Sequence, residues 1–263
     1  MGFVKVNNIN LHYEIRGTGP KVLFIHGIGA DLKNPAGIFN SPLPQHFTVL
    51  AFDPRGLGES DSPTESCSIA DMADDAAGLA AAVGWEKYHV FGASMGGMVA
   101  QELMLRHSSA VEKLVLGVTN AGIKSGAPVL ADKVYKTSAA EGLRIIDTRR
   151  DEAWVAANTE AVKQAEQQWL AVREAMRANP ALLRGFNNQV NAALKHDTFD
   201  RLSQIMVPTF IFGGLYDGSN PPKVTQMMAQ RIPNSRLALV EHGHSSWFLD
   251  PKVWEMIIDF LGN

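Results

Sequence analysis

Short segments with strand-like patterns of apolar residues alternate with longer helix-like segments over most of the chain. Apolar and polar positions alternate at residues 4–6 and 11–15, which is typical of strands with one buried face. The later runs are short and more continuously apolar, as expected for strands buried on both faces of a parallel sheet. These further strands are predicted at residues 21–25, 47–52, 88–91, 113–118, 207–212 and 236–240. The pattern predicts an α/β protein with a mostly parallel sheet flanked by helices.

The clearest predicted helix spans residues 68–83. Its apolar residues recur every three or four positions, and Ser68 with Asp71 forms a capping-box pattern at its start. Gly84 is suited to end this helix because glycine readily adopts a left-handed conformation. Helical patterns also cover residues 95–106, 222–231 and 252–261.

The pattern changes between residues 122 and 205, where no strand-like run occurs. This segment is rich in Ala, Gln and Glu, and its larger apolar residues recur at near-helical spacing. A helical insertion within a β–α alternation is typical of a cap placed over a sheet domain. We predict a core domain formed by residues 1–121 and 206–263, with a helical cap at residues 122–205 inserted after the sixth strand.

Composition narrows the class of protein. The chain has 263 residues, of which 46% are hydrophobic, so a single large α/β domain is possible. A net charge of −3 without a basic run argues against a nucleic-acid partner or an anionic membrane surface. One cysteine, Cys67, excludes an internal disulfide and a cysteine metal site. With no secretory signal pattern and no long apolar stretch, a cytoplasmic protein is predicted, and its oligomeric state is left open.

Residues 92–97 read Gly-Ala-Ser-Met-Gly-Gly and lie between a predicted strand and a predicted helix. A G-x-S-x-G sequence at such a junction is the pattern of a nucleophile elbow. The sharp turn would hold Ser94 in a strained backbone conformation, and the flanking glycines remove side chains that would clash there. We therefore predict a serine hydrolase with Ser94 as its nucleophile.

A serine hydroxyl is a weak nucleophile at neutral pH, so it needs a nearby base and a group that orients this base. Asp217 and His244 each follow a predicted strand, at the edge where parallel sheets gather their sites. His242 is an alternative to His244. We prefer His244 because it follows a glycine and stands several residues before the last helix. The predicted catalytic residues are Ser94, Asp217 and His244.

A negative charge that develops on the substrate oxygen would need backbone N–H donors. One predicted donor is Met95, and the second is Ile28, in the glycine-rich loop after the strand 21–25. Gly27 and Gly29 flank Ile28 and leave that loop open to a substrate. The predicted pocket comprises Gly27 and Gly29 together with the cap residues Trp154, Trp169, Met176 and Phe186. An alternative is that these four cap residues only pack the cap helices.

Five ordered motifs resemble those of the α/β-hydrolase fold family. They are His26-Gly27, the loop 53–60 (Asp-Pro-Arg-Gly-Leu-Gly-Glu-Ser), the elbow at Ser94, Gly214-x-x-Asp217 and Gly243-His244. The resemblance covers residues 3–121 and 206–262, and the order Ser, Asp, His is the order of that family. The sequence is most similar to capped esterases and lactonases such as the 3-oxoadipate enol-lactonases. In the loop 53–60, the resemblance implies a structural role for Asp53 and Arg55.

The predicted reaction is hydrolysis of a small to medium carboxylic ester or lactone through an acyl-enzyme, with no metal and no organic cofactor. One alternative uses the same three residues to hydrolyse a carbon–carbon bond of a keto-diene. A perhydrolase or haloperoxidase-like enzyme is a second alternative, although Ile28 stands where such members usually carry an aromatic residue. A ligand receptor on the same fold is a third. Ser94 argues against dehalogenases and epoxide hydrolases, which carry aspartate there.

Overall fold

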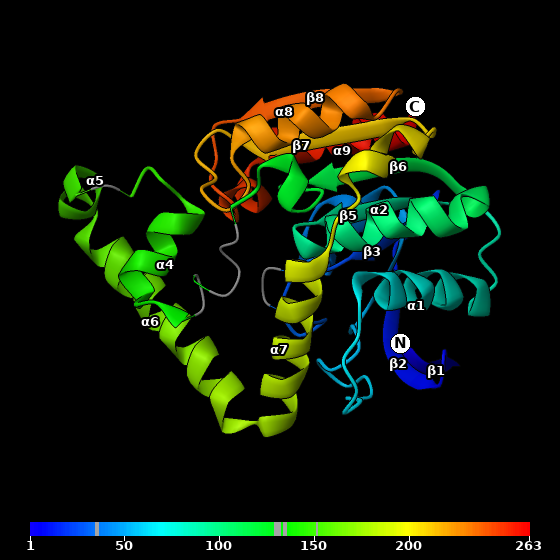
Figure 1. Ribbon diagram of the computed structural model, residues 1–263, viewed down its shortest axis with the longest axis horizontal. Helices are drawn as coiled ribbons and strands as arrows, with labels where there is room; N and C mark the ends of the chain where they lie inside the picture. The colour runs from blue at the N-terminus through cyan, green and yellow to red at the C-terminus, as the bar shows by residue number, and fades with distance from the viewer. Residues whose placement is uncertain (35–36, 129–132, 134–135, 151) are drawn as a thin grey trace.

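A computed structural model describes residues 1–34, 37–128, 133, 136–150 and 152–263, and its centre is an eight-stranded sheet (Figure 1). The strand order is β1-β2-β4-β3-β5-β6-β7-β8. The first two pairs of neighbours are antiparallel, and all the others are parallel. The strands are β1 (Gly2–Val6), β2 (Ile9–Arg16), β3 (Lys21–Ile25), β4 (Thr48–Phe52), β5 (Tyr88–Ala93), β6 (Val111–Gly117), β7 (Thr209–Gly214) and β8 (Ser235–Val240).

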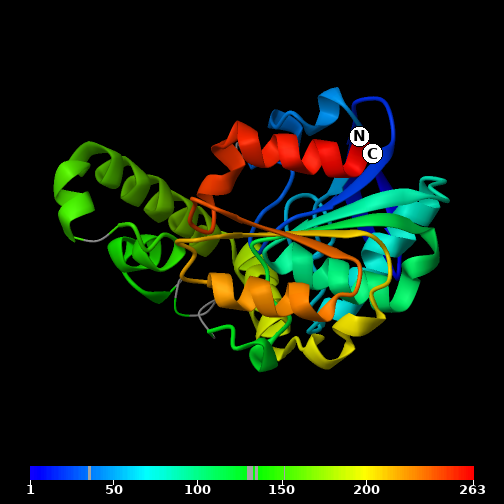
Figure 2. The ribbon, with the colours of Figure 1, turned by 90° about the horizontal axis from the view of Figure 1, so that it is seen from above.

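Helices cover both faces of the sheet. Figure 2 shows α1, α2 and α8 on one face and α9 on the other. The helices are α1 (Ile69–Ala82), α2 (Met95–His107), α4 (Ala139–Ile146), α5 (Glu152–Ala157), α6 (Thr159–Ala178), α7 (Pro180–Lys195), α8 (Pro222–Arg231) and α9 (Pro251–Gly262). Each face has its own apolar core, one built mainly under α1 and α2 and the other under α9. The predicted α/β fold with a mostly parallel sheet is therefore confirmed.

Most strands differ from the prediction by one to three residues at an end, and two of these differences have a clear local reason. β7 begins at Thr209 rather than at residue 207, because Pro208 has no N–H to donate to a neighbouring strand. β6 ends at Gly117 because the backbone of Val118 turns to a φ of 43°. That conformation is strained for a β-branched residue. It turns the chain at the edge of the sheet where the predicted site lies.

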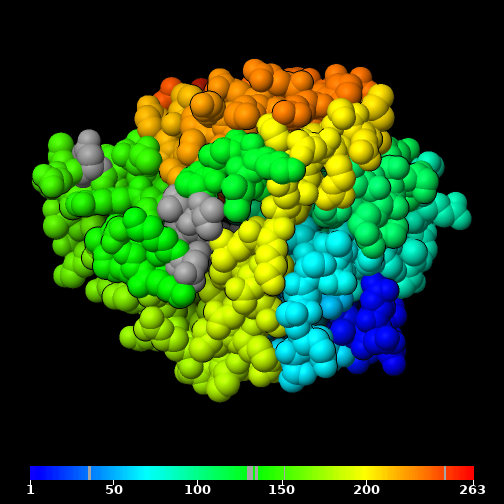
Figure 3. Space-filling model, viewed as in Figure 1, coloured from blue at the N-terminus to red at the C-terminus, as the bar shows by residue number. Residues whose placement is uncertain are grey.

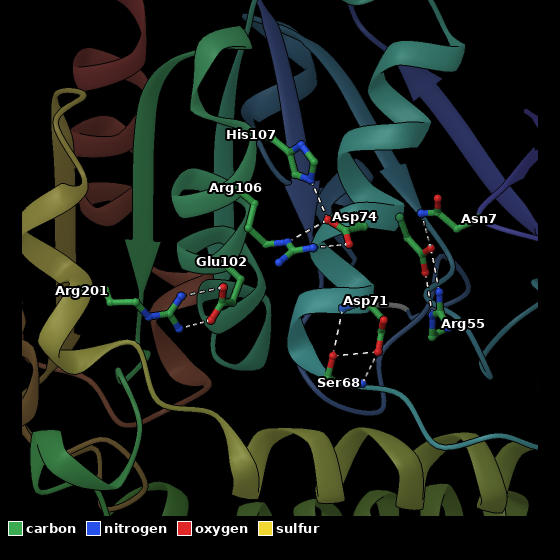
Figure 4. Close-up of polar contacts among 10 residues, drawn as sticks. Asn7, Arg55, Ser68, Asp71, Asp74, Glu102, Arg106, His107 and Arg201 are labelled. Carbon is green, nitrogen blue, oxygen red and sulfur yellow. Dashed lines mark hydrogen bonds and ion pairs between the residues drawn. The ribbon is translucent and has the colours of Figure 1, made fainter.

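Polar contacts fix the start of α1 and also join α1 to α2 (Figure 4). The predicted capping box is present, because Ser68 Oγ accepts from the Asp71 N–H while Asp71 Oδ2 accepts from the Ser68 N–H. Further along α1, Asp74 forms a bidentate ion pair with Arg106 of α2 at 2.7 and 2.9 Å. This pair holds the helix that follows Ser94 against its neighbour.

The helices α4 to α7 lie between β6 and β7 along the chain. The chain leaves and rejoins the sheet at one place, where Gly122 and Asp197 form an isolated antiparallel bridge. Figure 1 shows α4, α5 and α6 projecting beyond the sheet, whereas α7 returns beside it. On the return, Arg201 pairs with Glu102 of α2 (Figure 4). None of the helices in the described ranges combines the length and the apolar character that crossing a bilayer requires.

Candidate active site

Ser94 occupies a sharp turn between β5 and α2. Its φ of 56° and ψ of −122° lie outside the regions that non-glycine residues usually adopt. The turn brings backbone atoms so close that Gly92 and Gly96 have no room for a side chain. A Cβ on Gly92 would lie 2.2 Å from the Gly96 oxygen, and one on Gly96 would lie 2.1 Å from the Ile25 oxygen. Such strain costs about 1–3 kcal/mol, which the packed strands around the turn must offset.

Hydrogen bonds fix this turn from the neighbouring strand. The N–H of Ser94 donates to the Gly117 oxygen at 2.9 Å, and the Thr119 hydroxyl donates to the Ser94 oxygen at 2.7 Å. The Ser94 side chain is therefore presented at the carboxyl edge of the sheet, directly before the N-terminus of α2. The dipole of that helix favours negative charge at this position.

A continuous chain of hydrogen bonds joins the three predicted catalytic side chains. His244 Nε2 lies 2.9 Å from Ser94 Oγ, and His244 Nδ1 lies 2.8 Å from Asp217 Oδ2. Asp217 is buried, and its other oxygen accepts the N–H groups of Ser219 and Asn220, each at 2.8 Å. These hydrogen bonds orient the carboxylate toward the imidazole.

The pKa of His244 reflects two opposing effects. Burial lowers the pKa of the imidazole, but the charge of Asp217 and its hydrogen bond raise it by more, so the net pKa is above the usual 6.5. The second histidine of this loop is held elsewhere, because His242 Nε2 lies 2.6 Å from Asp250 Oδ2. The geometry therefore brings His244, and not His242, to Ser94.

The loop after β3 places backbone donors beside the serine. A Cβ on Gly27 would lie 3.3 Å from the Ser94 Cβ, so this loop passes directly over the nucleophile. Within the described part of the chain, neither the Ile28 N–H nor the Met95 N–H donates a hydrogen bond to a protein acceptor. Both donors are thus available to a ligand that enters next to Ser94 Oγ.

A cavity of about 150 Å³ opens beside Ser94 and His244. One part of its wall is apolar and comes from the core, the α4 end and the helices α6 and α7. Among these apolar residues are Ile28, Met98, Ile146, Trp169, Ala193 and Leu194, and residues 123–128 at the start of the insertion add Ile123, Ala127 and Pro128. Polar side chains form another part, and they are Asn120, Ser219, Asn220 and Ser245. The cavity therefore offers an apolar surface and hydrogen-bonding groups to the same ligand.

The structure separates the predicted pocket residues of the insertion. Trp169 lines the cavity beside Ser94. Met176 and Phe186 instead line a hollow between α6 and α7, because they stand near the corner where these helices meet. Trp154 lies in α5, away from the sheet, with Arg150 5.2 Å above its ring. Gly29 lies under the Phe186 ring, which would be 3.2 Å from a Cβ at that position.

Two cavity residues that the sequence reasoning missed are Asn120 and Asn220. The Asn120 side-chain N–H donates to Asn220 Oδ1 at 2.6 Å, and Asn220 in turn donates to the strained Val118 oxygen at 2.7 Å. Both residues follow the carboxyl ends of strands, which is the signal that also selected Asp217. Within the described ranges, no cluster of three His, Cys, Asp or Glu side chains is arranged to hold a metal ion.

Comparison with known proteins identifies the family. The sequence profile of the alpha/beta hydrolase fold family matches residues 20–251. The chain belongs to the α/β-hydrolase fold family. A relative from Azorhizobium caulinodans, named carbamate hydrolase RutD, is 27% identical over 280 residues, which cover 100% of this chain and 98% of the relative. The predicted family resemblance is confirmed, and this α/β hydrolase is similar to enzymes along its whole length.

Solved structures agree with the fold of this α/β hydrolase. An enol-lactonase from Burkholderia xenovorans LB400 superposes with a TM-score of 0.78 at 22% identity. An esterase from Exiguobacterium antarcticum superposes with a TM-score of 0.80, also at 22% identity. Each comparison covers 100% of both chains. At this level of identity, the similarity establishes the shared architecture.

The loop 53–60 of this hydrolase organises its surroundings through charged groups. Asp53 is fully buried and accepts hydrogen bonds from His12 Nδ1 at 2.8 Å and from the Leu32 N–H at 2.7 Å. Arg55 forms a bidentate pair with Asp75 of α1 at 2.7 and 2.8 Å (Figure 4). Asp53 thus holds the end of the loop that carries Ile28, and Arg55 holds the loop 53–60 on α1.

Proposed function

We propose that this α/β hydrolase cleaves small carboxylic esters or lactones through an acyl-enzyme on Ser94. The observation that carries the proposal is the unbroken hydrogen-bond chain from Ser94 Oγ through His244 to Asp217 at the wall of a cavity. A hydroxyl, a base and an orienting carboxylate are the groups that nucleophilic acyl transfer requires.

In the proposed first step, His244 Nε2 accepts the proton of Ser94 Oγ as this oxygen attacks the ester carbonyl carbon. The N–H groups of Ile28 and Met95 stabilise the negative charge on the carbonyl oxygen. His244 then donates its proton to the alkoxide that leaves. Asp217 keeps the imidazole in the required tautomer and stabilises its protonated form.

In the second step, His244 accepts a proton from water, which attacks the acyl-enzyme carbonyl. Collapse of this second tetrahedral intermediate releases the carboxylic acid and returns the proton to Ser94 Oγ. For a lactone, the alcohol stays attached to the acyl group, so the product is a single hydroxy acid. No metal and no cofactor takes part in these steps.

We further propose that residues 122–205 act as a cap that limits substrate size. Trp169, Ala193 and Leu194 come from this insertion and line the cavity beside Ser94. An engineered protein cavity of about 150 Å³ binds benzene. A cavity of similar volume therefore favours a short acyl or alcohol group, with the rest of a longer substrate outside it.

A second candidate substrate is a carbamate. The polar part of the cavity, formed by Asn120, Ser219 and Asn220, offers hydrogen-bonding partners for the nitrogen that distinguishes a carbamate from an ester. The relative that aligns over the whole chain is named as a carbamate hydrolase. The same attack by Ser94 would then give a carbamoyl-enzyme, which water cleaves more slowly because its carbonyl is less electrophilic.

Labelling with a fluorophosphonate tests the nucleophile, and hydrolysis of p-nitrophenyl acetate, butyrate and N-methylcarbamate tests the substrate class. The wild type should be labelled once per chain, and Ser94→Ala should lose labelling and about 10⁶-fold in kcat. Burst release of one nitrophenol per chain would mark an acyl- or carbamoyl-enzyme. Labelling that survives in Ser94→Ala would contradict the proposal.

A further inference from the structure

The inserted helix α7 reaches the loop that carries Ile28 through one completely buried side chain. Gln189 has an exposed fraction of 0%, and its Oε1 accepts the N–H of Gly29 at 2.9 Å. Because a backbone N–H can only donate, the side-chain amide of Gln189 must face the loop with its oxygen and not with its nitrogen. Gln189 does not line the cavity, so its contact is with the loop and not with a ligand.

The hydrogen bond acts next to a proposed oxyanion donor. The Gly29 N–H belongs to the peptide that follows Ile28, and the Ile28 N–H belongs to the peptide before it. Both peptides share the Ile28 Cα, so fixing one of them restricts rotation of the other. Gly29 has a φ of +72°, which glycine adopts easily and leaves as easily, so the loop itself offers little resistance to a change.

The loop is held from two sides by two different parts of the molecule. On the core side, Asp53 Oδ1 accepts the Leu32 N–H at 2.7 Å. On the insertion side, Gln189 holds Gly29, and the ring of Phe186, one helical turn earlier, packs over the same glycine. The donor at Ile28 thus lies between an anchor in the sheet core and an anchor in α7.

α7 is itself seated firmly enough to serve as an anchor. A Cβ on Gly185 would lie 2.0 Å from the Gly56 oxygen, so the two backbones are in direct contact. Beside this contact, Asn188 Nδ2 donates to the Glu65 oxygen at 3.3 Å. Figure 3 shows the yellow-green and yellow atoms of α7 lying along the cyan atoms of the segment after β4.

We infer that Gln189 is a positioning residue, which holds the Ile28–Gly29 peptide so that the Ile28 N–H faces the oxygen that becomes negatively charged. The inference rests on the proposed acyl transfer at Ser94 and adds a role for the insertion beyond covering the site. Through Gln189, the seating of α7 on the core and the stabilisation of the transition state are coupled.

Gln189→Met tests this role because methionine keeps the length of the side chain and removes its acceptor. We expect kcat for p-nitrophenyl butyrate to fall about 10- to 100-fold, somewhat less than the loss of an entire oxyanion donor. The affinity for a boronic acid that mimics the tetrahedral intermediate should fall by the same factor, whereas KM should change less than twofold. A purely structural role would not produce this match between kcat and boronate affinity.

Asn188→Leu is the matched control. It removes one hydrogen bond between α7 and the core without touching Gly29, so kcat and boronate affinity should stay within twofold of the wild type. Equal losses in the two variants would overturn the inference, as would unchanged boronate affinity in Gln189→Met. Failure of fluorophosphonate to label the wild type would instead overturn the proposed function.

A measurement on the wild type covers the case in which Gln189→Met does not fold. The Gly29 N–H should exchange with deuterated water far more slowly than the exposed N–H groups of the protein, because it is hydrogen-bonded to a buried oxygen. Exchange at the rate of an unprotected amide would overturn the inference without any substitution.

Discussion

The helices α6 and α7 belong to the same insertion, but they relate to the core in opposite ways. α6 has 20 residues and buries none of them, whereas α7 has 16 residues and buries five, Phe186 and Gln189 among them. α7 touches the core through the contact of Gly185 with Gly56. One helix of the insertion therefore packs closely against the core beside the candidate active site. The other helix, α6, contributes only Trp169 to the described lining of the cavity.

The three residues proposed to carry the chemistry lie in the core, so the largest effect is expected there and not in either helix. Asp217→Asn should lower kcat about 10⁴-fold, because an amide in this position stabilises the wrong tautomer of His244 and cannot stabilise its charged form. Kinetics with p-nitrophenyl acetate measure this loss. Asp250→Asn is the matched control: it changes the carboxylate partner of His242 and should leave kcat within a fewfold of the wild type. A comparable loss in that control would assign the base to His242.

The pH dependence of the same reaction has a definite sign. The proposed base must be neutral to accept a proton, and the Asp217 charge holds the pKa of His244 above 6.5 against the opposing effect of burial. In the wild type, kcat/KM should therefore rise with pH through a transition above 6.5. In Asp217→Asn, only the lowering effect of burial is left, so the transition should move below 6.5. A rate that does not vary between pH 5 and 8 would exclude His244 as the base.

The sequence predicted the elements and candidate site residues of the core in detail, but it predicted the insertion only as a helical segment. Strand and helix patterns are local, and the elbow at Ser94 with strand-end positions for Asp217 and His244 follows from topology. Nothing in the periodicity of the insertion states which helix faces the sheet. Trp169 and Met176 have the same helical pattern, yet only Trp169 lines the cavity beside Ser94. Their difference arises from the corner at residues 179–180 and from contacts far apart in sequence.

Gln189 illustrates the same limit more sharply. A glutamine in an Ala- and Asn-rich helix carries no local sign of burial, and the sequence reasoning did not select it. Its partner Gly29 is 160 residues away, so the contact depends on how α7 is seated. Gly185 and Gly56 allow that seating, but each glycine by itself is compatible with many other roles.

The junction where α7 returns the chain to the core should make the protein sensitive to acid. Burial lowers the pKa of His196 to about 4, with Arg201 adding to this effect and Glu102 and Asp197 opposing it. The unfolded chain binds this proton below pH 6.5, so the free energy of unfolding should fall as the pH drops from 6.5 to about 4. At about 1.4 kcal/mol per pH unit, the loss approaches about 3 kcal/mol.

Urea unfolding between pH 7 and 4 measures this loss. His196→Gln should flatten the decline by a similar amount, because glutamine binds no proton in either state. His26, the pKa of which burial also lowers to about 4 against the opposing charge of Asp53, should account for a second decline of the same sign. If the wild type and His196→Gln lose stability equally over this range, the junction is not the source of the acid sensitivity.

The close contact between the backbones of α7 and the core at Gly185 and Gly56 can be broken by a single methyl group. Gly185→Ala should raise the intrinsic helix propensity by about 1 kcal/mol, yet destabilise the protein by about 1–3 kcal/mol because the new Cβ overlaps the Gly56 oxygen. Thermal unfolding measures the change, and kcat should fall with it because Gln189 moves with the helix. Ala175→Ser on the exposed face of α6 is the control and should stay within about 0.5 kcal/mol. A Gly185→Ala variant more stable than the wild type would show that α7 is not tightly seated.

The smallest effect should come from α6, and it should concern substrate size alone. Trp169→Ala removes an apolar wall of the cavity, so KM for p-nitrophenyl butyrate should rise about 10-fold, equivalent to about 1.4 kcal/mol of lost contact. KM for the acetate should change less, because its shorter acyl group reaches less of the indole, and stability should hardly change in a helix that buries no residue. Leu170→Ala, at a neighbouring position that is 46% exposed, should leave both KM values unaltered. Two outcomes would contradict this: an equal change of KM for both esters in Trp169→Ala, or a change of KM in Leu170→Ala. Either would mean that α6 acts on the site through the fold of the insertion and not through the Trp169 side chain.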